Sequence, residues 1–180
     1  MVRAAPVCLP RSRRCGKVRE KEGDGMETFA CYDTDLGLLE VGCTGGAVTH
    51  MRWVDQPARP QTPTPLSDEA AHQVRQYLSG ERREFDLPLH PAGTDFQRTV
   101  WQALRAVPYG QTRTYGEIAR EMGRPGAARA VGAAAGRNPI WIAIPCHRCV
   151  GKNGTLTGYA GGLWRKEKLL ALEKSLLTGR

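Results

Sequence analysis

Two helix-start signals in the second half of the chain place the strongest constraint on the fold. Thr94-Asp95-Phe96-Gln97 and Thr114-Tyr115-Gly116-Glu117 each carry a threonine three residues before a Gln or Glu. In this capping box the two side chains satisfy backbone N–H groups that a helix start leaves unpaired. The pattern predicts helices running to about residue 106 and about residue 122. The second half of the chain is therefore expected to be mainly helical.

A further helix is predicted directly after these two. Gly123-Arg124-Pro125-Gly126 breaks the preceding helix, and residues 127–136 follow with a run of alanines. Two short helices joined by a glycine-containing turn are typical of a helix-turn-helix. The second helix has almost no bulky side chain, whereas helices that read the major groove present long polar groups. Its smooth face suits either close approach to a sugar-phosphate wall or tight helix packing, and the lone Arg129 favours the first.

The first half of the chain alternates short apolar runs with turn residues. Runs at residues 28–32, 36–41 and 47–54 predict a small antiparallel meander. The whole chain of 180 residues is long enough for one domain or two small ones. A small α/β unit followed by a helical unit is the simplest arrangement.

Proline and glycine mark the segment between these two halves. Residues 56–65 contain four prolines and are expected to form a loop. Ser67 is predicted to cap a helix over residues 68–79, which Gly80 would close. Residues 84–91 are expected to be extended and to link the two units.

Residues 1–25 differ in composition from the rest. They hold seven Arg or Lys and three acidic residues, so about half of the net charge of +8 lies there. Few of these side chains are apolar, which predicts a basic disordered tail. Met26, where the composition changes, is a candidate for the true start of the protein. Because the remainder is only mildly basic, charge permits nucleic-acid binding without establishing it.

Targeting and membrane signals are weak in this sequence. No apolar run approaches the roughly 20 residues that cross a bilayer, and no apolar segment follows the basic N-terminus as a secretory signal requires. We therefore expect a cytoplasmic protein that does not bind membranes. Its six cysteines are interpreted as reduced thiols and not as a disulfide framework.

Cys146 is the candidate nucleophile. It follows an apolar run at residues 140–144, predicted as a strand, and Pro145, and it precedes His147. A thiol needs a base to gain thiolate character, and a carboxylate can orient that base. Adjacent side chains diverge, so a water would relay the proton between Cys146 and His147. The carboxylate would be Glu167 or Glu173, on a leucine-rich helix predicted over residues 166–177. A buried structural cysteine is the ordinary alternative.

The pair Cys146 and Cys149 also matches half of a zinc site or a redox motif. Zinc needs two more ligands, and no second paired motif exists in the sequence. A thioredoxin-type motif opens a helix, whereas Gly151-Lys152-Asn153-Gly154 follows here. Both interpretations are therefore disfavoured, and no metal is expected.

The motifs around Cys146 resemble a known family. Asn138-Pro139-x-x-x-x-Ile144-Pro145-Cys146-His147-Arg148 is followed by Gly158-Tyr159-x-Gly161-Gly162-Leu163 and by Lys166-x-x-Leu169-Leu170-x-x-Glu173. Upstream lie Phe96-x-x-x-Val100-Trp101, Val107-Pro108-Tyr109-Gly110, Thr114-Tyr115 and Ala128-Arg129-Ala130-Val131-Gly132. In order and spacing, over residues 95–173, these motifs closely resemble the O6-alkylguanine-DNA alkyltransferases.

This resemblance implies a fold and an activity. The fold would be an α/β ribonuclease H-like domain at residues 26–91 and a mainly α domain at residues 92–180, with a winged-helix-like helix-turn-helix and the active-site cysteine. The activity would be direct-reversal DNA repair. Cys146 would take a methyl or other alkyl group irreversibly from guanine O6 in duplex DNA, after minor-groove binding and base flipping, and O4 of thymine is a further candidate. No cofactor is implied, and a monomer is expected.

The resemblance also assigns the catalytic roles. Cys146 would attack the alkyl carbon, and His147 would act as base through a water. Glu173 would orient His147 and stabilise its charge. Tyr115 would donate a proton or hydrogen bond to guanine N3.

Substrate binding is implied for seven further positions. Arg129 would replace the flipped nucleotide in the stack, and Asn138 would brace the turn before the cysteine. Main-chain groups of Cys146, Cys149 and Ala160 would read the guanine. Tyr159 belongs to the matched glycine-rich loop, and Ala135 and Trp141 would line the pocket.

The sequence departs from the family pattern at Cys149, where valine is usual, and at Ala160, where some members have serine. A Cys146–Cys149 disulfide is one consequence, and it would silence the nucleophile. Two rival functions share some of these features. A lesion-binding relative would keep Arg129 but lack the nucleophile, which the presence of Cys146 argues against. A redox or metal protein would use the cysteine pair.

Overall fold

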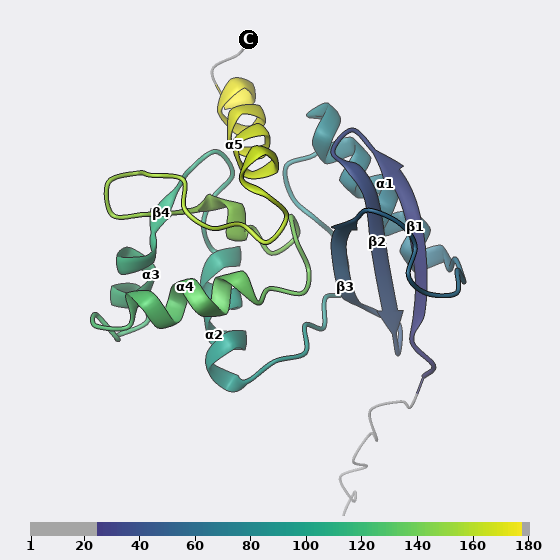
Figure 1. Cartoon of the computed structure of the whole chain (residues 1–180), viewed down its shortest axis with the longest axis horizontal. Coiled ribbons are helices and arrows are strands. Elements are labelled where there is room, and N and C mark those ends of the chain that lie inside the picture. Colours follow the sequence, from purple (N-terminus) through teal and green to yellow (C-terminus); the bar gives the residue numbers. More distant parts are fainter. Residues whose placement is uncertain (1–24, 178–180) are drawn as a thin grey trace, which may run out of the picture.

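The computed structural model describes residues 25–177, so the predicted tail at residues 1–25 lies almost wholly outside it. The first part is an antiparallel sheet in the order β1-β2-β3, formed by Thr28–Thr34, Gly37–Thr44 and Ala47–Val54. Helix α1 (Pro65–Ser79) packs on the sheet, as Figure 1 shows. The predicted meander is confirmed, and so is the α/β character of this part.

Helix α1 begins earlier than the sequence predicts. Its N-cap is Thr64, and Ser67 is the N3 partner in a reciprocal capping box, not the cap itself. Pro65 occupies the first helical turn, where its missing N–H costs nothing. The predicted proline loop therefore ends one residue sooner. Gly80 closes the helix with a left-handed φ of 84°, as expected.

The second part is mainly helical. It contains α2 (Asp95–Arg105), α3 (Tyr115–Glu121), α4 (Ala128–Gly136) and α5 (Leu163–Leu177). Both predicted capping boxes are present at Thr94 and Thr114. Helices α3 and α4 pack together as the helix-turn-helix, and β4 (Arg113–Thr114) pairs with β5 (Cys149–Val150) beside it. Helix α5 starts three residues before the predicted residue 166.

Residues 140–144 do not form the predicted strand. Only Ile140 makes a bridge, to Met51 of β3, and residues 141–144 turn. Pro139 O accepts from Met51 N–H at 2.8 Å, and Trp141 N–H donates to Met51 O at 2.8 Å. The run is apolar because it is buried between the two parts of the molecule, and burial does not distinguish a strand from a turn.

The junction of the two parts is where the candidate site lies. The 3-10 turn η1 (Cys146–Arg148) follows the segment at residues 140–144 and packs against α2 and α5. Helix α5 stands at this junction, beside both the sheet and the helical part (Figure 1). The last helix in the sequence therefore closes the site from behind.

Candidate active site

A tight turn held by Asn138 positions Cys146. The buried Asn138 Nδ2 donates to the Ile144 carbonyl at 2.8 Å and to Cys146 Sγ at 3.2 Å. Its Oδ1 accepts from Ile140 N–H at 3.0 Å. Within this turn Ile142 has a left-handed φ of 68°, which is strained for a β-branched residue. One side-chain amide thus closes the turn and touches the candidate nucleophile.

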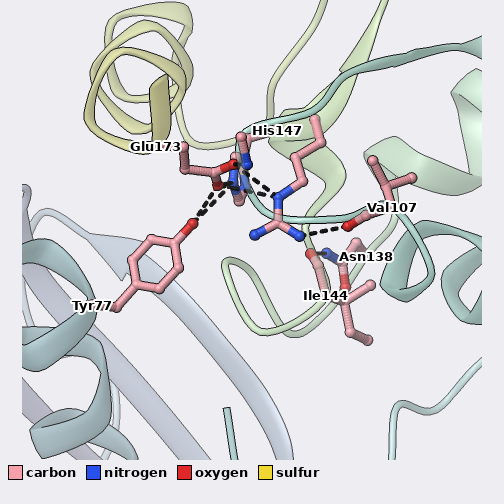
Figure 2. A network of polar contacts seen from close by, with 8 residues as sticks. Tyr77, Val107, Asn138, Ile144, His147 and Glu173 are labelled. Carbon is pink, nitrogen blue, oxygen red and sulfur yellow. Dashed lines mark hydrogen bonds and ion pairs between the residues drawn. The ribbon is translucent and has the colours of Figure 1, made fainter. Parts of the chain in front are cut away.

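Next to Cys146, His147 and Glu173 form a buried pair. Both side chains are fully excluded from solvent, and His147 Nε2 lies 2.6 Å from Glu173 Oε1. Figure 2 shows Glu173 descending from α5 onto this ring. Glu167, the other candidate carboxylate, is exposed on the same helix. The structure therefore brings Glu173, and not Glu167, to His147.

Glu173 accepts hydrogen bonds from three further residues. Arg148 Nε donates to both carboxylate oxygens, at 3.1 and 3.0 Å, and Gly110 N–H donates to Oε2 at 2.7 Å. The Tyr77 hydroxyl donates to Oε1. Burial alone would raise the pKa of Glu173, but the hydrogen bonds and charges of its partners, His147 first, lower it to about 2. Glu173 is therefore a carboxylate at neutral pH.

The same burial keeps both partners of the candidate proton transfer neutral. It raises the pKa of the Cys146 thiol to about 11, although the Asn138 amide and the Lys166 ammonium act in the opposite direction. It lowers the pKa of His147, although Glu173 opposes this. Cys146 is consequently a thiol at neutral pH, and His147 is a neutral base with a carboxylate behind it. This arrangement can take a proton from a thiol and stabilise the resulting imidazolium.

Lys166 lies under the neighbouring loop. Its side chain is fully buried, and Nζ donates to the carbonyls of Cys149, at 2.5 Å, and Thr157, at 2.9 Å. The Cys149 side chain is also fully buried, which raises its pKa to about 12. Cys149 thus contributes a carbonyl that Lys166 holds in place. Its thiol and that of Cys146 are both free.

A pocket of about 240 Å³ opens in front of Cys146. It brings together five of the predicted residues with three glycines, and its lining is Tyr115, Gly132, Ala135, Gly136, Cys146, Gly158, Tyr159 and Ala160. The Tyr115 hydroxyl donates to Thr157 O at 3.3 Å. Burial raises the pKa of Tyr115, so its hydroxyl keeps its proton and can donate it to a ligand.

Trp141 lies outside this lining, contrary to the prediction. Its ring packs against Tyr159, with 5.8 Å between centroids, and against Trp53, with 6.0 Å. It borders a neighbouring hollow of about 320 Å³ that His50 and Arg52 also line. Because residues 141–144 turn instead of continuing as a strand, Trp141 faces the sheet. It supports Tyr159 from behind.

Helix α4 has two different faces. One buries Val131, Ala134 and Ala135 against the rest of the helical part. The other exposes Arg129, Ala133 and further small residues. The Ala/Gly pattern therefore serves close packing on one face and leaves a slim surface on the other. Arg129 lies exposed at the start of this surface.

Sequence reasoning missed one residue of this network entirely. Tyr77 lies on α1, far from the cysteine motif in sequence, yet its hydroxyl reaches Glu173. The available signal was its position: with Ala70 and Val74 it falls on the buried face of the predicted helix. A buried tyrosine hydroxyl needs a partner, but the sequence does not identify that partner.

Among residues 25–177, no three or more His, Cys, Asp or Glu side chains gather closely enough to hold a metal ion. In the same residues, no helix has the length and apolar character needed to span a membrane.

The fold and the site together define a class of protein in which a helical domain with a helix-turn-helix, typical of DNA binding, carries a buried cysteine next to a histidine–glutamate pair. The family described as 6-O-methylguanine DNA methyltransferase, DNA binding domain, matches residues 95–175. Its ribonuclease-like domain matches residues 28–91. The chain belongs to the 6-O-methylguanine DNA methyltransferase family.

Similar proteins agree with this assignment. The methylated-DNA–protein-cysteine methyltransferase of Mycolicibacterium paratuberculosis is 49% identical, over 83% of this chain and 93% of its own. That of Methanosarcina acetivorans is 59% identical over 59% of this chain and 69% of its own. A solved structure of the Mycobacterium tuberculosis protein in complex with DNA has 49% identity and a TM-score of 0.77, covering 83% of this chain and 94% of that one. The predicted fold class and family are confirmed.

Proposed function

We propose that this protein repairs alkylated duplex DNA by transferring the alkyl group from guanine O6 to Cys146. One observation carries the proposal: Cys146 lines a pocket, and the next residue in the chain, His147, is bonded to the buried Glu173. A cysteine with this surrounding has both a space for a carbon electrophile and a base for its proton. The DNA-bound structure of the M. tuberculosis relative supports DNA as the partner.

The reaction follows from the chemistry of these groups. The sulfur–carbon bond forms as the bond between that carbon and guanine O6 breaks. His147 takes the thiol proton through a water, and Glu173 stabilises the imidazolium. Tyr115 gives its hydroxyl proton to guanine N3, so the base leaves neutral. The proton on His147 then replaces it on the Tyr115 oxygen, and both side chains return to their starting state. Because a thioether is stable, each molecule acts once.

Access to the pocket requires the base to leave the helix. The slim face of α4 suits the minor groove, and the exposed Arg129 would fill the gap in the stack. Main-chain groups of Cys149 and Ala160 would recognise the guanine. Residues 92–180 would then form the DNA-binding and acceptor unit, with residues 26–91 packed behind it and one copy of the chain per lesion.

Intact-mass measurement tests the proposal. The protein is mixed with duplex DNA containing one O6-methylguanine, and O4-methylthymine DNA is tested in parallel. We expect a mass gain of one methyl group in place of hydrogen, mapped to the peptide with Cys146, and no gain in Cys146→Ser. An unmodified protein that only binds the DNA would instead support the lesion-binding function.

A further inference from the structure

Tyr77 connects the sheet domain to the buried histidine–glutamate pair. It lies on α1, and its side chain is fully buried. Its hydroxyl donates to Glu173 Oε1 and lies 3.5 Å from His147 Nε2. Figure 2 shows Tyr77 entering the network from the opposite side to Asn138. The sheet domain thus supplies a polar group at the centre of the site.

The hydrogen bonds determine where the protons lie. Glu173 Oε1 is an acceptor, so His147 Nε2, at 2.6 Å, must carry the proton between them. The lone pair of the neutral imidazole is then on Nδ1. That atom is buried and has no hydrogen-bond partner among the described residues. In this tautomer Nδ1 is the basic nitrogen of His147, and Glu173 holds the other.

We propose that Tyr77 is a positioning residue for alkyl transfer, through which the sheet domain orients Glu173 and sets the basicity of His147. This inference rests on the proposed function and adds a residue outside the helical domain to its machinery. Tyr77 does not touch the alkyl group. It acts by fixing the carboxylate oxygen that accepts the hydrogen bond from His147 Nε2.

Packing alone does not explain the hydroxyl. The Tyr77 ring stacks on Phe85, with 5.2 Å between centroids, and meets Tyr109 edge-on at 5.7 Å. Phenylalanine would make both contacts without burying a polar group. The buried Tyr77 hydroxyl instead donates a hydrogen bond to Glu173, the carboxylate that also accepts the hydrogen bond from His147.

Removing the hydroxyl has a predictable electrostatic consequence. The hydrogen bond from Tyr77 is one of the contributions that lower the pKa of Glu173, after the larger ones from His147 and Arg148. Without it the carboxylate charge is less stabilised and interacts more strongly with a protonated His147. The pKa values of Glu173 and His147 both rise, so His147 is protonated, and lost as a base, at a higher pH. The carboxylate also loses one of its anchors.

The test compares Tyr77→Phe with Tyr32→Phe. Tyr32 also belongs to the sheet domain and loses comparable hydrogen bonds, to Ser67 and Asp68 at 2.7 Å each, but it lies outside the site. Single-turnover transfer rates on O6-methylguanine duplex are measured at saturating protein from about pH 5 to about pH 9. DNA affinity and Tm are measured beside them. We expect Tyr77→Phe to lower the transfer rate about tenfold. The acid limb of the pH–rate profile, where the rate falls as His147 is protonated, should move upward by about half a pH unit. The DNA affinity should stay at the wild-type value.

Tyr32→Phe is expected to lower Tm without moving the acid limb. A Tyr77→Phe protein with the wild-type acid limb overturns the inference, whatever its rate or Tm. Wild-type protein that gains no methyl group overturns the proposed function instead, so the two failures are distinct.

Fluorinated tyrosines at position 77 cover the case in which Tyr77→Phe does not fold. They keep the ring and the hydroxyl but make it a stronger donor. With 3-fluorotyrosine and then 3,5-difluorotyrosine, the acid limb should move stepwise to lower pH. A limb that stays in place across this series would exclude a role for the Tyr77 hydrogen bond.

Discussion

Cys146 has two dissimilar sides. In front is a pocket lined by small residues such as Gly132 and Ala135, with Tyr115 as a polar donor. Behind is a network in which Glu173 accepts hydrogen bonds from His147, Arg148 and two other residues. The front is open, and the rear is excluded from solvent.

This difference separates two tasks. A substrate must enter and leave at the front, so that side offers an open pocket and a single hydrogen-bond donor, Tyr115. Proton transfer needs a fixed geometry in a low dielectric, so the rear is filled with mutually bonded polar groups. Substitutions at the rear should therefore change both the chemistry and the stability of the fold. Substitutions on the exposed face of α4, such as Arg129, should change only the use of DNA.

Glu173→Gln should produce the largest effect. The amide cannot stabilise a protonated His147, and it leaves Arg148 buried without a counter-charge. We expect the transfer rate to fall about 100-fold or more and the free energy of unfolding to fall by about 3–5 kcal/mol. Glu167→Gln, on the exposed face of the same helix, is the matched control. Single-turnover kinetics and urea denaturation measure the two effects. An equally active Glu173→Gln protein would contradict the assignment of the rear side.

Arg129→Ala should affect only substrates that need a base flipped out of the helix. We expect transfer from O6-methylguanine in duplex DNA to slow by about tenfold, since flipping costs a few kcal/mol. Transfer from the free base O6-benzylguanine should keep its rate, and the exposed side chain should leave Tm unchanged.

Arg137→Ala controls for loss of positive charge beside the same helix, where Arg137 is also exposed. It should weaken DNA binding in a salt-dependent way and leave the step after binding unchanged. If Arg129→Ala slows the free-base reaction equally, the division between front and rear fails.

Acid should destabilise the fold in part through the rear side. The pKa of His147 is lowered in the folded protein, so the unfolded chain binds the extra proton and stability falls below about pH 6.5. The pKa of Glu173 is about 2 when folded. Its contribution is complete above the unfolded value of about 4.3 and is lost as the pH falls further. Urea midpoints measured from neutral pH downward should show both stages, and Glu173→Gln should lack the second.

Cys149→Val should have the smallest effect, visible only under oxidation. A disulfide reagent such as oxidised glutathione would accept two electrons from Cys146 and Cys149, forming their disulfide and releasing reduced thiol. We expect treated wild-type protein to lose transfer activity and to regain it with dithiothreitol. Cys149→Val should show no such reversible disulfide. Equal reagent sensitivity of both proteins, with no Cys146–Cys149 bridge in peptide maps, would refute the hypothesis.

Local signals predicted most of the helices and strands. The capping boxes at Thr94 and Thr114 and the glycine closure at Gly80 are present as expected, because each depends on contacts within a few residues. The strand at residues 140–144 was wrong because an apolar run reports burial and not backbone direction. Ser67 was misplaced as a cap because Thr64 and Ser67 both carry capping hydroxyls.

The sequence by itself determined the local elements and, through ordered motifs, the family and the cysteine. The residues by themselves left Glu167 and Glu173 open, and the family resemblance pointed to Glu173. The tertiary structure supplied the physical reason, because it buries Glu173 against His147 and leaves Glu167 exposed on α5. It alone brought Tyr77 to the same carboxylate. Contacts between residues distant in the chain depend on how whole elements pack, and that packing is absent from any short stretch of sequence.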